Sequence, residues 1–204
     1  MKLSVPFYGQ SWNLDAYEKL GYKDREEAEY WQRSCCGILC IKMAMDSFLI
    51  QQHKLLTPSI KELIDRGVKR GFYTDASGWS HEGLANMVHD FGFSGVSQDL
   101  SVNGLRDALQ KHWVPIVSIK WGFRNTKTLK EKLLFWKKYG GHLGLLVGFE
   151  EEHGSVTGFY VHQTSKILEQ NWQARFVPIK NFLVGYTGRG IIIGLEETAH
   201  KEKL

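Results

Sequence analysis

Three cysteines that could do nucleophilic chemistry lie close together in the sequence: Cys35, Cys36 and Cys40. The residues around them predict a helix that starts here, with Ser34 as its N-cap. Cys35 or Cys36 would then lie at the positive end of the helix dipole, where a thiol loses its proton most easily. Gly37 has no side chain and lets another backbone or a substrate approach closely. Because most free cysteines are inert, buried small hydrophobes, an unreactive thiol is the alternative.

The stretch 34–50, SCCGILCIKMAMDSFLI, predicts a helix in the protein core. After Gly37 only Lys42, Asp46 and Ser47 are polar, and a helix that is apolar nearly all round belongs inside a fold. Lys42 and Asp46 stand four positions apart, so we expect them to share one narrow exposed face.

A histidine that could act as a base is His142. It follows two glycines and enters the apolar run LGLLVGF, which predicts a buried strand. In two-layer cysteine hydrolases the nucleophile begins a central helix and the base lies on a strand of the facing sheet. A third polar group orients the imidazole, and a glutamine amide helps to bind the oxyanion. The chain order fits this arrangement. His81, at a predicted helix start, is a weaker second candidate.

The elements that would position these side chains change from helices to strands along the chain. Residues 3–10 are predicted to be extended, at a sheet edge because of Pro6. Helices are predicted over 24–34, 34–50, 57–71, 80–92 and 102–112, with Pro58 at the first position of the third. Strands are predicted over 114–121, 143–149, 155–162 and 190–195, with a hairpin turn at 150–154. Helices first and strands later indicate an α+β fold, one helical layer packed on an antiparallel sheet.

No repeat or low-complexity linker divides the chain, so residues 1–204 predict a single domain. Residues 122–139 form a basic insertion between two predicted strands, with six lysines and arginines against Glu131. A capping box of Thr128 and Glu131 predicts an amphipathic helix with a solvated basic face. A lid that draws acidic substrates is the alternative, because the insertion leads directly to His142. The tail from about 196 to 204 is expected to be flexible.

Composition narrows the function. The chain is 43% hydrophobic, which suits one sizeable core, and its formal net charge of +4 gives no reason to expect nucleic-acid binding. The sequence has no membrane-spanning run and no visible signal peptide, so we expect a cytoplasmic protein that does not bind membranes, with a trimmed secreted form as the alternative. The clustered cysteines predict no disulfide framework. They also point different ways along a helix, which argues against a zinc site. We expect no metal or cofactor.

Several short motifs occur in a suggestive order: VPFYGQ, CGILCIKMAM, GWSHEGL, PIVSIKW and GGHLGLLVGFE. Together, over most of residues 4–194, they resemble papain-like cysteine peptidases of the bacteriocin-processing (double-glycine leader) group and their stand-alone relatives. The first resembles the group's Val-Pro-Tyr-Tyr-Ser-Gln opening and the second its Cys-Gly-x-x-Cys-x-x-Met helix. The third resembles its Gly-x-x-His-x-x-Leu segment, and the last two resemble its central strands. The resemblance implies a papain-like cysteine proteinase fold.

Position by position, the resemblance implies Cys36 as the nucleophile and His142 as the general base. It implies that the Gln10 amide and the Cys36 backbone N–H bind the oxyanion, with Gln32, nearer to the cysteine in sequence, as the rival of Gln10. Where the group has a third catalytic Asp, this chain has Gln163. An amide oxygen can orient the imidazole, but it carries no charge to stabilise the imidazolium. We therefore expect reduced or specialised activity.

These observations predict a cysteine peptidase or amide hydrolase that forms a thioester at Cys36 and acts on a peptide or an acyl amide. An acyltransferase, in which an amine replaces water on the same site, is one alternative. A peptide-binding module whose catalysis is weakened by Gln163 is the other. The sequence leaves the oligomeric state open.

Overall fold

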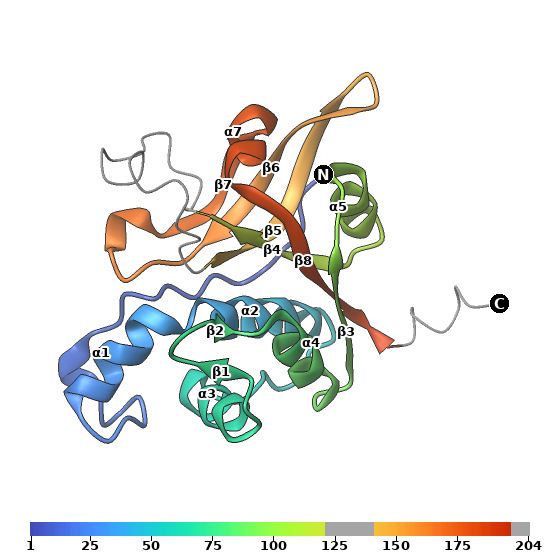
Figure 1. The fold of residues 1–204 in the computed structure, drawn as a ribbon. Helices are drawn as coiled ribbons and strands as arrows, with labels where there is room; N and C mark the ends of the chain where they lie inside the picture. The colour runs from blue at the N-terminus through green and yellow to red at the C-terminus, as the bar shows by residue number, and fades with distance from the viewer. Residues whose placement is uncertain (121–140, 197–204) are drawn as a thin grey trace.

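The structure is a computed structural model that describes residues 1–120 and 141–196 (Figure 1). The predicted basic insertion 122–139 lies outside the described residues, as does the predicted tail after residue 196.

Helices dominate the first half of the chain. After the short η1 (Leu14–Ala16), a layer of helices lies below the sheet in Figure 1. These are α1 (Arg25–Ser34), α2 (Cys36–Gln51), α3 (Ile60–Lys69) and α4 (His81–His89). Between α3 and α4, β1 (Tyr73–Thr74) pairs with β2 (Gly78–Trp79). Every residue of α2 from Gly37 to Phe48 is buried, so the predicted core helix is confirmed.

The second half of the chain builds the sheet. Within the described ranges, six antiparallel strands are ordered β3-β8-β4-β5-β6-β7. They are β3 (Phe93–Asp99), β4 (Val114–Ile119), β5 (His142–Glu152), β6 (Ser155–Gln163), β7 (Trp172–Pro178) and β8 (Tyr186–Leu195). The last strand, β8, lies between β3 and β4, so it joins the end of the chain to its middle. The predicted α+β class is confirmed.

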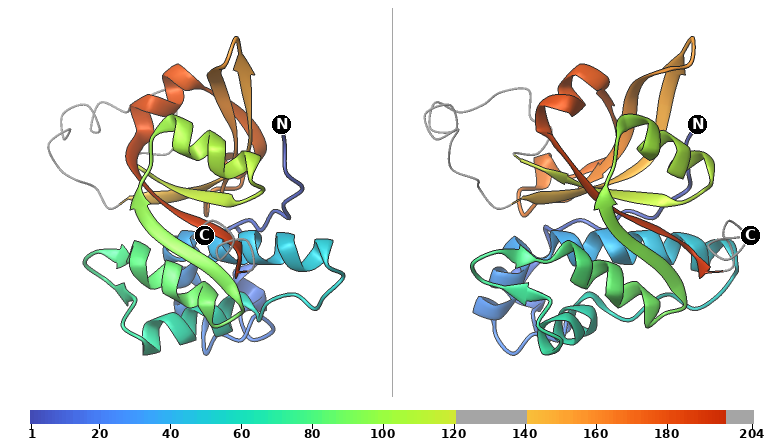
Figure 2. Two further views of the ribbon diagram at one scale, coloured as in Figure 1. Left: turned by 90° about the vertical axis from the view of Figure 1, so that its right-hand side faces the viewer. Right: turned by 45° about the vertical axis from the view of Figure 1, so that its right-hand side comes forward.

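Hydrophobic side chains cover both faces of this sheet. Leu145 of β5 belongs to the cluster around α2, whereas its neighbour Leu146 belongs to a cluster on the opposite face. This follows because successive strand residues point to opposite faces. The second cluster includes Leu105 of α5 (Val102–Gln110) and Phe182 of α7 (Ile179–Gly185). The prediction of a single helical layer was therefore incomplete, since α5 and α7 lie across the sheet from α2 (Figure 2).

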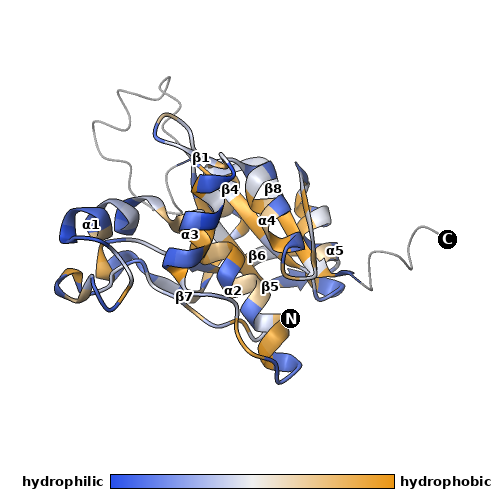
Figure 3. Ribbon diagram, turned by 90° about the horizontal axis from the view of Figure 1, so that it is seen from below, coloured by the Kyte–Doolittle hydropathy of each residue, from blue (hydrophilic) through white to orange (hydrophobic). Residues whose placement is uncertain are grey.

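Hydropathy follows this layering. In Figure 3, hydrophobic residues gather where α4 meets the strands, whereas the outer turns are hydrophilic. In the described part of the chain no single helix is long and apolar enough to cross a membrane. Taken together, α1 and α2 are long and apolar enough to meet this requirement, but the pair is bent by 73° at the break between the two helices.

Several helix starts agree with the sequence and one differs. Asp24 caps α1 by accepting from the N–H of Glu27, and Ser80 caps α4 as predicted. The prediction that α3 starts with Pro58 at its first position was wrong. Ser59 is its N-cap and forms a capping box with Glu62, because each then satisfies a donor of the other.

Three of the longer elements were not predicted: β3, β7 and α7. Both strands lie at sheet edges, and each buries only two or fewer of its side chains. A strand with so few buried residues shows no clear apolar alternation in its sequence.

Candidate active site

Cys36 is the first residue of α2, immediately after the bend from α1. The residue at the N-cap position is Cys35, without a side-chain hydrogen bond. Ser34 was wrongly predicted as the cap, because it still belongs to α1, where its carbonyl accepts from Trp79 Nε1 at 2.8 Å. At the first position of a helix, the backbone N–H of Cys36 has no acceptor within that helix.

The three thiols have different environments. Cys35 and Cys40 are fully buried, and burial raises the pKa of each well above its usual range. Cys36 is half-buried. Burial also opposes its thiolate, but the charge of His142, a hydrogen bond with that imidazole and two backbone N–H groups outweigh burial. The pKa of Cys36 is therefore lowered, as expected for a nucleophilic thiol.

His142 is brought to Cys36 by the contact between β5 and α2. The backbone of Leu143, the next residue, binds two successive turns of the helix. Its N–H donates to the sulfur of Cys36, and its carbonyl accepts from Cys40 Sγ at 3.7 Å. The first residue of β5 thus lies beside the first residue of α2.

Gly37 is required at this junction, although not for the predicted reason. A Cβ atom there would lie 2.7 Å from Leu84 Cδ1 and 3.2 Å from Leu143 Cδ1. It is packed side chains, rather than a backbone or a substrate, that approach the glycine. The bare position lets α2 pack closely against α4 and β5.

The second histidine candidate occupies a different setting. His81 begins α4, where burial and then the charge of Arg189 lower its pKa. Among the described residues, the histidine whose charge and hydrogen bond act on Cys36 is His142.

Gln163, the predicted third residue, is the last residue of β6. It pairs with Gly144 of β5, and His142 stands two positions from Gly144 on the same face of the strand. His142 and Gln163 are therefore diagonal neighbours across the two strands. The Gln163 side chain is buried, and its Nε2 donates to the carbonyl of Gln170 at 3.3 Å. In an amide side chain the oxygen, Oε1, is the atom able to accept an imidazole N–H.

The two glutamines considered for the oxyanion use their amides differently. Both are buried. Gln10 Oε1 accepts from the hydroxyl of Thr164 at 3.1 Å, and within residues 1–120 and 141–196 its Nε2 has no hydrogen-bond partner. Gln32 Nε2 instead donates to the carbonyl of Trp12 at 2.8 Å. The amide N–H groups of Gln10 are thus available to a substrate, whereas that of Gln32 is engaged.

The N-terminal segment that carries Gln10 runs beside β5, in agreement with the extended structure predicted for 3–10. The N–H of Leu3 donates to the carbonyl of Val147 at 2.6 Å. The carbonyl of Val5 lies 3.1 Å from Nε2 of the buried His162. Because Nδ1 of His162 accepts from the N–H of Ala174 at 2.8 Å, Nε2 is the donor to Val5.

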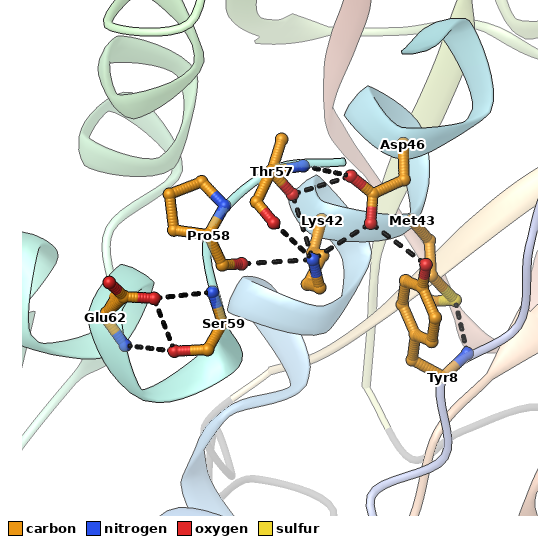
Figure 4. Close-up of polar contacts among 8 residues, drawn as sticks. All are labelled: Tyr8, Lys42, Met43, Asp46, Thr57, Pro58, Ser59 and Glu62. Atoms are coloured by element: carbon orange, nitrogen blue, oxygen red, sulfur yellow. Dashed lines mark hydrogen bonds and ion pairs between the residues drawn. The ribbon is translucent and has the colours of Figure 1, made fainter. Parts of the chain in front are cut away.

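Further along this segment, Tyr8 is bound to α2 (Figure 4). Its hydroxyl donates to Asp46 Oδ2 at 3.0 Å, and its N–H contacts Met43 Sδ at 3.3 Å. Burial and the Asp46 carboxylate raise the pKa of Tyr8 to about 12, so its hydroxyl remains a donor at neutral pH. The residue two positions before Gln10 is therefore held at two points.

The prediction that Lys42 and Asp46 share an exposed face was wrong. They are only 9% and 0% exposed, and Lys42 Nζ lies 3.0 Å from Asp46 Oδ2. The chain before α3 folds over both residues (Figure 4). Lys42 Nζ also donates to Thr57 and to the Pro58 carbonyl. Asp46 Oδ1 accepts from the N–H and the hydroxyl of Thr57. These hydrogen bonds satisfy both charges inside the fold.

Asn171 was missed by the sequence analysis, because a single asparagine in a polar stretch carries no motif. Its Oδ1 accepts from the N–H of Gln10 at 3.4 Å and of Ser165 at 2.9 Å. Its Nδ2 donates to the carbonyl of Ser165 at 2.9 Å and to Ser11 Oγ at 3.1 Å. Asn171 thus fastens the segment around Gln10 to the loop that follows β6.

No metal site competes with this interpretation in the described ranges. Among residues 1–120 and 141–196, no group of three or more His, Cys, Asp or Glu side chains is placed to hold a metal ion.

A buried helix with a cysteine at its start, packed on an antiparallel sheet whose facing strand begins with a histidine, is the arrangement of papain-like cysteine peptidases. No protein-family model and no curated protein matches the sequence. Solved structures do match the fold. A putative C39-like peptidase from Bacillus anthracis has a TM-score of 0.57 at 13% identity, over 95% of this chain and 98% of that one.

Other matching structures are peptidases from transporters. A double glycine motif protease from an AMS/PCAT transporter, in complex with the leader peptide, has a TM-score of 0.51 at 13% identity, over 94% of this chain and 92% of that one. The peptidase domain of Streptococcus ComA, a bi-functional ABC transporter, has a TM-score of 0.51 at 14% identity, over 79% and 92%. The papain-like fold that the motifs predict is therefore confirmed, in the form of the C39-like peptidases.

Proposed function

We propose that this chain is a cysteine peptidase or amide hydrolase with Cys36 as its nucleophile. One observation carries the proposal: the Cys36 thiol at the start of α2 has a lowered pKa because it lies beside His142. The other two cysteines, Cys35 and Cys40, have raised pKa values and are fully buried. A reactive, accessible thiol paired with a histidine is the requirement for thiol acyl transfer.

In the proposed reaction, the Cys36 thiolate attacks the substrate carbonyl carbon, and the carbonyl oxygen becomes an oxyanion. The Gln10 Nε2 group and the Cys36 backbone N–H would donate to that oxygen. The intermediate collapses as His142, having taken the thiol proton, gives it to the departing amine. Water, deprotonated by His142, then attacks the thioester, which releases the acid and restores the thiol.

Gln163 would orient the imidazole of His142 without adding charge. A neutral amide gives the imidazolium less stabilisation than a carboxylate, so the proposed enzyme would be slower than one with Asp at this position. This role rests on the diagonal placement of the two residues across β5 and β6.

The test is to trap the acyl-enzyme. The protein is incubated with a peptide library at low pH, where thioesters survive, and intact-mass and tryptic mass spectrometry locate any acyl group. We expect acylation at Cys36 in the wild type and in Cys40→Ala, and none in Cys36→Ala. Acylation at another residue, or hydrolysis that survives Cys36→Ala, would contradict the assignment.

A peptide substrate is the favoured class. One structure with the same fold contains a bound leader peptide, which supports a peptide as the ligand of this fold. A cytoplasmic location and a single domain over 1–204 stay predictions of the sequence.

The neutral Gln163 favours a second candidate, a peptide-binding module with little catalysis. Such a module would bind peptides equally well with Cys36 or with Cys36→Ala and would form no thioester. An acyltransferase would form the thioester but pass the acyl group to an added amine. Absence of a thioester would identify the binding module, and the ratio of aminolysis to hydrolysis at increasing amine concentration separates the acyltransferase from the hydrolase.

A further inference from the structure

A hollow of about 340 Å³ is formed largely by residues 11–32, the stretch inserted between the VPFYGQ and CGILCIKMAM motifs. Its lining includes Ser11, Trp12, Asp15, Arg25, Gln32 and Lys166. The proposed reaction uses none of these side chains. What the hollow binds is therefore a separate question from how Cys36 reacts.

Three segments that carry the proposed active-site residues converge on this hollow. Ser11 follows Gln10 directly, and Gln32 stands four positions before Cys36, across the bend between α1 and α2. Lys166 comes three positions after Gln163. Figure 1 shows the N-terminal segment passing between α1 and the loop that precedes β7. The hollow therefore adjoins the site on the side of the oxyanion glutamine.

Two of its walls are fastened together by one side chain. Asn171 donates to Ser11 Oγ at 3.1 Å and to the Ser165 carbonyl at 2.9 Å, and it accepts from the N–H of Ser165. The backbone on either side of the hollow is therefore fixed relative to Gln10. Lys166 follows Ser165, whose backbone Asn171 holds, so the backbone of Lys166 is anchored while its side chain remains exposed.

The hollow has an excess of positive charge, with Arg25 and Lys166 against Asp15. Arg25 Nη1 and Asp15 Oδ1 lie 2.8 Å apart and neutralise each other. Lys166 forms no ion pair with any residue in the described ranges. The unpaired ammonium of Lys166 favours an occupant with a negatively charged oxygen.

We propose that this hollow is a substrate subsite that binds a carboxylate side chain, Asp or Glu, of the peptide, with Lys166 as the residue that selects its charge. The proposal rests on the proposed function, because it places the acidic residue near the bond that Cys36 would attack. It gives the insertion 11–32 a role in specificity.

The test uses chloroacetyl-capped tetrapeptides that differ only by Glu or Gln at one position, which is moved along the peptide. The Cys36 thiolate forms a C–S bond and chloride leaves, so the labelling rate reports the thiol and the subsite without hydrolysis. In the wild type we expect the Glu peptide to label Cys36 about threefold to tenfold faster than the Gln peptide at one position. Equal rates at every position would overturn the proposal.

Variants then assign the preference to Lys166. Lys166→Gln should bring the ratio of Glu to Gln rates close to one, and Lys166→Glu should reverse it in favour of a Lys peptide. Lys180→Gln, an exposed lysine on α7, is the matched control and should leave the ratio unchanged. A preference for Glu that survives Lys166→Gln would overturn the assignment.

A second measurement separates this proposal from the proposed function. The same peptides without the chloroacetyl group, carrying a fluorophore, are titrated with Cys36→Ala and followed by fluorescence anisotropy. Tighter binding of the Glu peptide, lost in Cys36→Ala/Lys166→Gln, supports the subsite even if Cys36 proves unreactive. Equal affinities for Glu and Gln peptides refute it even if Cys36 proves to be the nucleophile.

Discussion

The hydroxyl of Thr164 donates a hydrogen bond of 3.1 Å to Oε1 of Gln10, and both side chains are buried. This bond determines which end of the Gln10 amide faces away from the loop after β6. With Oε1 held by Thr164, the N–H groups of Nε2 are the ones left for a substrate oxygen. Gln10 therefore keeps Nε2 free of hydrogen bonds to the described residues, as the proposed oxyanion role requires.

The first prediction concerns this bond. Thr164→Val keeps the shape of the side chain but removes its donor, so the Gln10 amide loses its fixed orientation. We expect kcat for amide hydrolysis to fall about tenfold with little change in KM, because removing an oxyanion donor outright costs about 10²–10³ in kcat. Thr164→Ser, which retains the hydroxyl, is the control and should keep most of the rate. An unchanged kcat in Thr164→Val would contradict the role of Gln10.

The second prediction concerns the pH dependence of Cys36. Its pKa is lowered because the charge and hydrogen bond of His142 outweigh burial. In His142→Ala the imidazole no longer opposes the effect of burial on the Cys36 thiol. The pKa of Cys36 therefore rises, and its thiolate forms only at higher pH. We expect iodoacetamide labelling of Cys36 at pH 7 to slow by about tenfold or more, with its profile displaced to higher pH.

Rates of Cys36 labelling measured from pH 5 to 10, with the site read by peptide mass spectrometry, check this shift. His81→Ala is the matched control, since His81 begins α4, and its profile should match the wild type. Superimposable profiles for His142→Ala and the wild type would show that His142 does not activate the thiol.

The third prediction concerns Gln163. Gln163→Asp places a carboxylate on the strand position diagonal to His142, where it can stabilise the imidazolium. We expect the rate of amide hydrolysis to rise by about tenfold, less than the roughly 10²–10⁴-fold that a general acid–base catalyst contributes outright, because the carboxylate acts only through His142. Gln163→Leu, which removes the acceptor, should lower it. If neither change alters the rate, Gln163 does not act on His142.

The fourth prediction concerns the buried ion pair of Lys42 and Asp46. Removing one partner leaves the other charge buried, which typically costs about 3–5 kcal/mol of unfolding free energy. We expect Lys42→Met and Asp46→Asn each to lower stability by about 3 kcal/mol in urea unfolding. The double variant should lose clearly less than the two losses combined, because no unpaired charge remains. Strictly additive losses would show that the pair is not coupled.

Local sequence patterns were sufficient for the parts of this fold that depend on nearby residues. The unbroken apolar run after Gly37 identifies the core helix, and the apolar run after His142 identifies the central strand. Both signals are periodicities within one element, so they need no knowledge of the rest of the chain. The edge strands β3 and β7 were missed because they bury few side chains.

Contacts between distant segments could not be predicted in this way. The exposed face expected for Lys42 and Asp46 is covered by the chain at Thr57 and Pro58, which no helical periodicity reports. The choice between Gln10 and Gln32 likewise depends on which amide is already engaged by the protein. Asn171 became visible only through its bonds to both walls of the hollow.

The sequence by itself indicated a cysteine at a helix start and a histidine that opens an apolar strand, since residue type and local periodicity carry that information, and the ordered motifs suggested their pairing through a resemblance. The tertiary structure alone decided that His142 lowers the pKa of Cys36, that Thr164 orients Gln10, and that Lys166 borders the hollow beside them. The physical reason is that these effects act over a few ångströms between residues that lie far apart in the chain. Only the packed fold brings such residues together.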